Sequence, residues 1–84
     1  MEESSTLIEL EEFLSDIVFC GINNIDINVV DRLKLVKESL LGFDYLIELI
    51  DSLIYSIESS NNTQIIDSIA KIEFYIINYY GLNN

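Results

Sequence analysis

Residues that interrupt helices or support catalysis are absent or scarce in this chain. It has no proline and only three glycines, and because both residue types weaken or end helices, their scarcity favours an all-α fold. It has no histidine, the side chain that most readily serves as an acid or base near neutral pH. Its single cysteine, Cys20, excludes an internal disulfide and fits a reducing compartment. We therefore expect a helical protein that is not an enzyme.

Basic residues are also scarce, with four lysines and arginines against fifteen acids and a net charge of −11. A chain with this charge repels nucleic acid and anionic lipid, since both are bound through basic patches. We expect a basic protein partner, with no direct contact to nucleic acid or membrane. Half of the residues are nonetheless apolar, which is rich for one small helical domain spanning residues 1–84. A partner-binding face or a homodimer seam would cover the surplus.

Long apolar runs are missing as well. The longest run without a polar residue extends from Ile17 to Ile22, far short of the ~20 residues that cross a bilayer. The sequence has no basic segment that is followed by an apolar run, so we expect no signal peptide. The sequence therefore predicts a cytoplasmic protein.

The chain is organised around a heptad pattern that extends from Val29 to Ile57. Steps of four and three residues alternate along it, which is the spacing of one helix face. Gly42 interrupts the pattern, so the stretch forms either one long helix or two helices that fold back on each other. The charge order favours a break, because Lys37 would end one helix and Asp44 would begin the next, as helix dipoles prefer. The apolar positions are Val29, Leu33, Val36, Leu40, Phe43, Ile47, Ile50, Ile54 and Ile57.

A break at Gly42 gives four segments of similar length, at roughly 5–20, 27–41, 44–59 and 63–80. These segments predict a small antiparallel four-helix bundle, because equal antiparallel helices bury one another well. The alternative is three helices, with one long helix continuous through Gly42. Further core positions are expected at Leu7, Leu10, Phe13, Leu14, Ile17, Val18, Leu46, Leu53, Ile65, Ile66, Ile69, Ile72, Ile76 and Ile77.

Local signals indicate where the helices begin and end. Thr6 and Glu9 form a T-x-x-E capping box that would open the first helix. Gly21 can take the left-handed conformation that ends it. The other candidate starts are Asp26 or Asn28 as the cap of the second helix, Asp44 as the cap of the third, and Asn62 or Thr63 for the fourth.

Metal and cofactor sites find little support in the sequence. Asn24, Asp26 and Asn28 alternate like the first half of a calcium loop. However, Val29 and Leu35 stand where such a loop needs glycine and glutamate. The chain has no second cysteine for a transition-metal site and no glycine-rich phosphate loop. We expect neither a metal nor a cofactor.

Two short motifs carry chemistry in a known family. Asp51-Ser52-Leu53 and Asp67-Ser68-Ile69 resemble the D-S-[LI] triplet of acyl and peptidyl carrier proteins. Those are small, acidic four-helix proteins whose serine takes a phosphopantetheine arm. The resemblance implies that Ser52 or Ser68 would carry the arm. The family's serine opens a helix, whereas Ser52 falls within the third predicted helix.

Acidic faces and tyrosines give the stronger indication of function. Residues 1–21 carry six acids and no base, and the stretch between Gly42 and Asn61 carries four acids and no base. Tyrosine offers a large contact area with a polar tip and is favoured at interfaces. Acids around it steer a basic partner. The candidate partner-binding residues are Asp44, Glu48, Asp51, Tyr55, Glu58, Glu9, Glu12, Asp16, Tyr75 and Tyr79.

These features predict a small acidic binding protein, and specifically an immunity protein that neutralises a bacterial toxin. A nuclease is the favoured target, because an acidic face would occlude the basic surface where phosphates lie. The alternatives are a phage inhibitor that mimics nucleic acid, a carrier-like protein and a structural oligomerisation module. The inhibitor would lose affinity for its partner as salt rises. The oligomerisation module would instead self-associate through its surplus apolar surface, and this association would not depend on the acidic faces.

Overall fold

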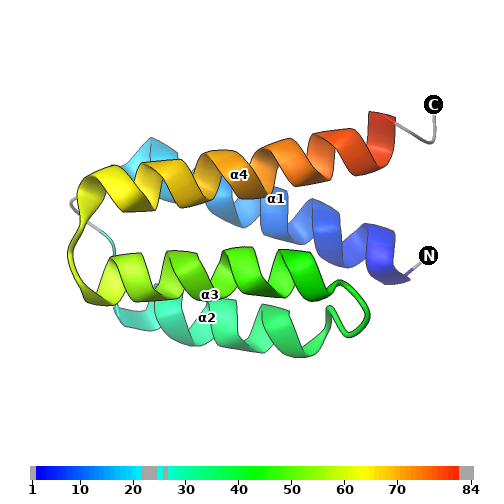
Figure 1. Cartoon of the computed structure of the whole chain (residues 1–84), viewed down its shortest axis with the longest axis horizontal. Helices are drawn as coiled ribbons and strands as arrows, with labels where there is room; N and C mark the ends of the chain where they lie inside the picture. Colours follow the sequence, from blue (N-terminus) through cyan, green and yellow to red (C-terminus); the bar gives the residue numbers. More distant parts are fainter. Residues whose placement is uncertain (1, 22–24, 26, 82–84) are drawn as a thin grey trace.

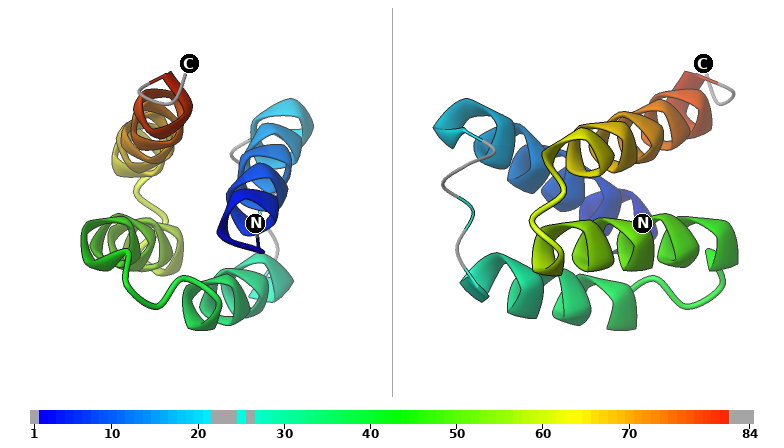
Figure 2. Two further views of the ribbon diagram at one scale, coloured as in Figure 1. Left: turned by 90° about the vertical axis from the view of Figure 1, so that its right-hand side faces the viewer. Right: turned by 60° about the vertical axis from the view of Figure 1, so that its left-hand side comes forward.

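Four helices make up the described part of the protein, which is residues 2–21, 25 and 27–81 of the computed structural model. They are α1 (Glu2–Cys20), α2 (Ile27–Glu38), α3 (Asp44–Glu58) and α4 (Asn62–Gly81), and these residues include no strand. Each helix runs opposite to the one before it (Figure 1). Seen end-on, the helices occupy four corners, with α1 diagonal to α3 (Figure 2). The prediction of a small all-α four-helix bundle is confirmed.

The heptad stretch is divided at Gly42, so the alternative of one continuous helix is wrong. α2 ends at Glu38, and Gly42 has a φ of +100°, a left-handed conformation that an α-helix interior does not contain. Across the turn, the N–H of Phe43 donates to the carbonyl of Leu40 at 3.0 Å. Leu40 is fully buried although it follows the end of α2. The apolar pattern therefore continues through a turn, which is why it resembles one helix in the sequence.

The first two helices do not start at the caps that the sequence predicts. α1 begins at Glu2, four residues before Thr6, so the capping box does not open this helix. The sequence has two acids ahead of Thr6, a residue type that the N-terminus of a helix favours, so the segment before the capping box is compatible with a longer helix. Asn28 lies inside α2, which begins at Ile27, and is therefore not its cap. The other candidate, Asp26, lies outside the described residues.

The later two helices differ in how they are capped. α3 begins at Asp44, and its cap position falls on Phe43, whose side chain makes no capping hydrogen bond. Asp44 is therefore not the N-cap, but it lies in the first turn, where the helix dipole favours a carboxylate. α4 begins at Asn62, one of the two predicted positions. The N–H of Gln64 donates to Oδ1 of Asn61 at 3.2 Å, so Asn61 caps this helix.

The turn between α3 and α4 is a Schellman motif in which Ser60 stands where glycine is usual. Ser60 has a φ of +54°. Its N–H donates to the carbonyl of Ile57 at 3.1 Å, and the N–H of Asn61 donates to the carbonyl of Ser56 at 3.0 Å. These are the two hydrogen bonds that define the motif. The short turn lays α4 against α3, and these two helices form the most extensive pair in the bundle.

One apolar core runs through the bundle and takes residues from all four helices. Every position of the heptad stretch is buried or packs against this core, as predicted. Three predicted core positions are wrong, because Val18, Ile66 and Ile77 are 53%, 57% and 62% exposed. They lie outside the single stripe that each helix turns toward its neighbours. The buried apolar residues are Leu7, Leu10, Phe13, Leu14, Ile17, Val30, Leu33, Leu40, Leu46, Leu49, Ile50, Leu53, Ile54, Ile65, Ile69, Ile72 and Ile76.

Two contacts made by basic side chains join α2 to its neighbours. The guanidinium of Arg32 lies 4.3 Å from the ring centre of Phe13 on α1, which is a cation–π contact. The ammonium of Lys37 pairs with the carboxylate of Asp51 on α3. α2 carries three of the four bases of the chain, and it stands between the two most acidic helices. Its charge therefore attracts α1 and α3 into the bundle.

Candidate functional site

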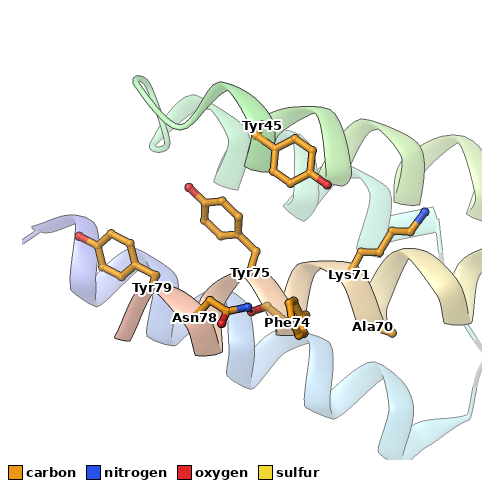
Figure 3. A pocket seen from close by; sticks show the side chains of 7 residues that line it. All are labelled: Tyr45, Ala70, Lys71, Phe74, Tyr75, Asn78 and Tyr79. Carbon is orange, nitrogen blue, oxygen red and sulfur yellow. The ribbon is translucent and has the colours of Figure 1, made fainter. Parts of the chain in front are cut away.

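A groove of about 610 Å³ lies between α3 and α4 (Figure 3). Tyr45 enters it from the first turn of α3, and the other lining residues lie between Ala70 and Tyr79 on α4. They share one side of α4, because residues three and four positions apart are neighbours on a helix surface. The lining residues are Tyr45, Ala70, Lys71, Phe74, Tyr75, Asn78 and Tyr79.

Aromatic rings form the walls of this groove. The ring centres of Tyr45 and Tyr75 are 6.0 Å apart, and Tyr75 rises from α4 toward α3 (Figure 3). The rings of Phe43 and Tyr79 meet edge to face with centres 5.9 Å apart, a favoured aromatic geometry. Tyr45 and Phe74 are 58% and 67% exposed. The groove therefore offers solvent an aromatic surface that packing between the two helices holds in place.

Lys71 brings a positive charge to the lining of the groove. Its ammonium lies 3.0 Å from the carboxylate of Asp67, one turn earlier on α4. The hydrogen bond from Lys71 to Asp67, and the attraction between their charges, raise the pKa of Lys71 above its usual value of 10.5. Lys71 therefore stays protonated at neutral pH, and the carboxylate of Asp67 balances its charge.

Acidic residues of α3 flank Tyr45, the residue that this helix contributes to the groove. Glu48 is exposed one turn after Tyr45, and Asp44 is exposed one turn before Glu48. Tyr55 and Glu58 are exposed farther along the same helix, with Tyr55 at 65%. We call Asp44, Glu48, Tyr55 and Glu58 the α3 acidic face. Asp44 directly precedes the lining residue Tyr45 and Glu48 follows it by one turn, so acids are close to the aromatic groove at this point of α3.

Asp51, a fifth residue predicted on this helix, has a structural contact. Its carboxylate pairs with the ammonium of Lys37, which stands on α2. The pair turns Asp51 toward the seam between α2 and α3, away from the groove, which lies toward α4. Asp51 therefore contributes less negative charge to a partner than Asp44, Glu48 or Glu58.

The acids predicted on α1 belong to a separate surface. Glu9, Glu12 and Asp16 are all exposed on α1. All seven lining residues of the groove belong to α3 and α4, so these α1 acids form a surface apart from it. The structure thus brings Tyr75 and Tyr79 close to the start of α3 and leaves the α1 acids apart from them.

Five lining residues of the groove do not belong to the predicted partner-binding set. The sequence contains one indication of such a surface. The aromatic residues near the end of α4 are more numerous than one helical stripe can bury. This signal does not show which rings line a groove, since that depends on the rotation of α4 against α3. The five residues are Tyr45, Ala70, Lys71, Phe74 and Asn78.

The described residues also bear on metal binding, membrane insertion and the two carrier-like serines. Within residues 2–21, 25 and 27–81, no three acidic, cysteine or histidine side chains gather where they could hold a metal ion. None of the helices described there is long and apolar enough to cross a bilayer. Of the two carrier-like serines, Ser68 is only 4% exposed. Ser52 lies within α3, where its carbonyl accepts a hydrogen bond from the hydroxyl of Ser56 at 2.7 Å.

The fold and the groove together define a class of protein. It is a small all-α four-helix bundle with an exposed aromatic groove beside an acidic helix face. Comparisons with protein-family models, curated proteins and solved structures gave no match. The groove and the charges around it are the features that bear on function, because a fold alone does not determine function.

Proposed function

We propose that the protein is a non-enzymatic inhibitor that binds a basic protein through the groove and the α3 acidic face. The observation that carries this proposal is the exposed aromatic groove that adjoins acids at the start of α3. Aromatic side chains supply contact area at a low cost in conformational entropy. The acids beside them attract lysine and arginine side chains and fix the orientation of the partner.

Binding by such a surface has two physical stages. The net charge of −11 steers a basic partner toward the protein and raises the association rate, most strongly at low salt. Docking then buries an apolar side chain of the partner among Tyr45, Phe74 and Tyr75. A buried central anchor of this kind is worth roughly 2–4 kcal/mol when it is truncated. Lys71 does not repel the partner strongly, because Asp67 balances its charge.

In its specific form, the proposal is an immunity protein for a bacterial nuclease toxin. Nucleases hold phosphates with lysine and arginine, so their working surface is one that an acidic protein can occlude. A phage inhibitor that mimics nucleic acid is the second candidate, and mimicry requires acids in continuous rows on one face. The acids of α1 and α3 stand on diagonal helices and do not form one row. Their separation favours an inhibitor with a local docking site.

The test pairs the protein with the product of the gene that neighbours its own. We expect co-expression to restore the growth of cells that this product alone arrests. We expect the purified pair to form a complex that weakens as salt rises. Glu48→Lys reverses a charge beside the groove, and titration calorimetry should show a loss of affinity of about tenfold or more.

Glu12→Lys is the matched control, because it makes the same change of charge at an exposed position on α1. We expect it to slow association slightly and to leave the dissociation rate unchanged. Equal losses of affinity from the two variants would show that net charge alone governs binding, and the proposed site would be abandoned. A complex that resists both reversals and salt would overturn the inhibitor proposal itself.

A further inference from the structure

The groove continues along α4 as an exposed apolar stripe. Ile66, Phe74 and Ile77 are 57%, 67% and 62% exposed, and Ala70 is exposed between Ile66 and Phe74. Steps of four, four and three residues place all four side chains on one face of the helix. Ala70 and Phe74 also line the groove (Figure 3), so the groove and the stripe form one surface. We call Ile66, Ala70, Phe74 and Ile77 the α4 outer stripe.

The α4 outer stripe is long and narrow. Ile66 and Ile77 lie about 16 Å apart along the helix axis, because each residue of an α-helix advances by about 1.5 Å. Ala70 has the smallest side chain of the stripe and lies between the larger Ile66 and Phe74. A large side chain of a partner therefore fits above Ala70, as ridges of one helix fit into grooves of another. This shape suits one elongated segment that places an apolar side chain at each turn.

The backbone of α4 determines which conformation such a segment has. Asn62–Gly81 is helical, so the backbone groups beneath the stripe are hydrogen-bonded within the helix and offer none to a partner. An extended segment would leave its own N–H and C=O groups unpaired where docking buried them. An α-helix pairs these groups internally and repeats its apolar side chains every three or four residues. The occupant that fits the stripe is therefore a helix.

Acidic side chains stand at both edges of this surface. On α3, Glu48 is exposed one turn after Tyr45, the residue that this helix contributes to the groove. On α4, Glu73 is half-buried and stands one turn after Ala70. Glu73 lies ~200° around the helix from Tyr75, which rises toward α3 (Figure 3), so it borders the stripe on the side away from α3.

The base between these two edges is compensated. The ammonium of Lys71 lies 3.0 Å from the carboxylate of Asp67, so this pair adds no net charge to the surface. A docked helix with basic residues on both flanks is therefore attracted at both edges, whereas acidic flanks would be repelled there.

We propose that the groove and the α4 outer stripe together receive an amphipathic α-helix of the partner, in which lysine or arginine flanks an apolar stripe on both sides. The helix lies along α4, with one basic flank toward Glu48 and the other toward Glu73. This inference rests on the proposed function, because it names the part of the basic partner that docks. It also extends the binding surface to Ile66 and Ile77, which do not line the groove.

Two synthetic peptides test the docked helix. Both are about 14 residues long, enough to span the stripe, and both contain the same leucines, lysines and alanines. In the stripe peptide the leucines recur every three or four residues with lysines on either side, and in the scrambled peptide they are spread around the helix. Because the peptides have equal charge, attraction to an acidic protein does not distinguish them. We expect fluorescence anisotropy to show that the stripe peptide binds about tenfold more tightly or better.

Neutral substitutions locate the peptide without changing the net charge of the protein. Ile66→Gln and Ile77→Gln alter the stripe outside the groove lining, and we expect each to weaken binding of the stripe peptide about threefold or more. Leu35→Gln is the matched control, because Leu35 is 65% exposed on α2, and we expect it to leave binding unchanged. Circular dichroism establishes that the three variants keep their helices.

Three outcomes would overturn the docked helix. The first is equal affinity of the two peptides, and the second is an equal loss of affinity from Ile66→Gln and Leu35→Gln. The third is a wild-type protein that dimerises in sedimentation velocity, with a dimer that Ile66→Gln weakens, because a second copy of the chain would then occupy the stripe.

The docked helix and the inhibitor proposal fail separately. An intact partner that loses affinity with Glu48→Lys but not with Ile66→Gln would overturn the docked helix and support the inhibitor. A neighbouring gene product that does not bind, together with tight and selective binding of the stripe peptide, would do the reverse.

Discussion

Ser60 holds a backbone conformation that its side chain disfavours. Among the described non-glycine residues it alone has a positive φ, at +54°. For residues with a Cβ atom this region costs roughly 1–2 kcal/mol. Two Schellman hydrogen bonds and the packing of α4 on α3 offset that cost. The turn is therefore strained at one residue, and the strain can be relieved there without disturbing the core.

We predict that Ser60→Gly stabilises the protein. Glycine has no Cβ atom, so the left-handed conformation no longer carries a steric cost, although the unfolded chain gains some freedom. The net effect should raise the free energy of unfolding by about 0.5–1 kcal/mol, measured by urea denaturation.

Ser59→Gly is the control for this prediction, because Ser59 has an ordinary φ of −89°. Glycine there gains nothing sterically and should lower the free energy of unfolding by about 0.5 kcal/mol. If both glycine variants changed stability in the same direction, the strain assigned to Ser60 would be wrong.

At the scale of helices, Gly42 determines where the heptad stretch divides. A Cβ atom built on Gly42 would meet no other atom within 4 Å, so space does not restrict this position. The φ of +100° restricts this position instead, because residues that have a Cβ atom rarely adopt that backbone conformation. The position therefore requires glycine for the shape of the backbone and not for close packing.

We predict that Gly42→Ala lowers the free energy of unfolding by about 1–2 kcal/mol. A continuous helix through this position would respond in the opposite way, since alanine is about 1 kcal/mol better than glycine inside a helix. The sign of the change, measured by urea denaturation, therefore distinguishes the two architectures. Gly42→Asn should be tolerated better than alanine, because asparagine adopts left-handed conformations more readily.

Helix existence could be predicted from the sequence, because the spacing of apolar residues reports it directly. The buried face of α4 could not be predicted fully, since Ile66 and Ile77 are as apolar as Ile65 and Ile76. Both pairs satisfy helical spacing, and only the positions of α1 and α3 determine which pair is covered. The groove could not be predicted either. Tyr45 and Tyr75 are thirty residues apart in the sequence, and their rings meet only because α3 packs against α4.

At the scale of the whole molecule, repulsion among acids opposes folding. The net charge of −11 is spread mainly over α1 and α3, which the bundle places diagonally. Salt screens this repulsion, with a Debye length of about 8 Å at 0.15 M. We predict that the melting temperature rises by several degrees from low to physiological ionic strength, since ~1 kcal/mol corresponds to about 4–8 °C in a domain of this size.

Calorimetry or circular dichroism in sodium chloride checks this prediction, and a variant supplies the control. Replacing Glu11 and Glu12 by glutamine removes two exposed charges from α1 and should reduce the rise. A melting temperature that falls as salt increases would show that attractive ion pairs, such as Lys37 with Asp51, outweigh repulsion.

The polarity of the bundle has a practical consequence for fusion proteins. α1 begins, α3 begins and α4 ends at the same end of the molecule (Figure 1), and the groove lies between the last two of these helix ends. A reporter or affinity tag joined ahead of α1 or behind α4 would therefore stand near the groove and hinder a bulky partner. The α3–α4 turn at Ser60 lies at the opposite end, so a label attached there would report on binding without obstructing it.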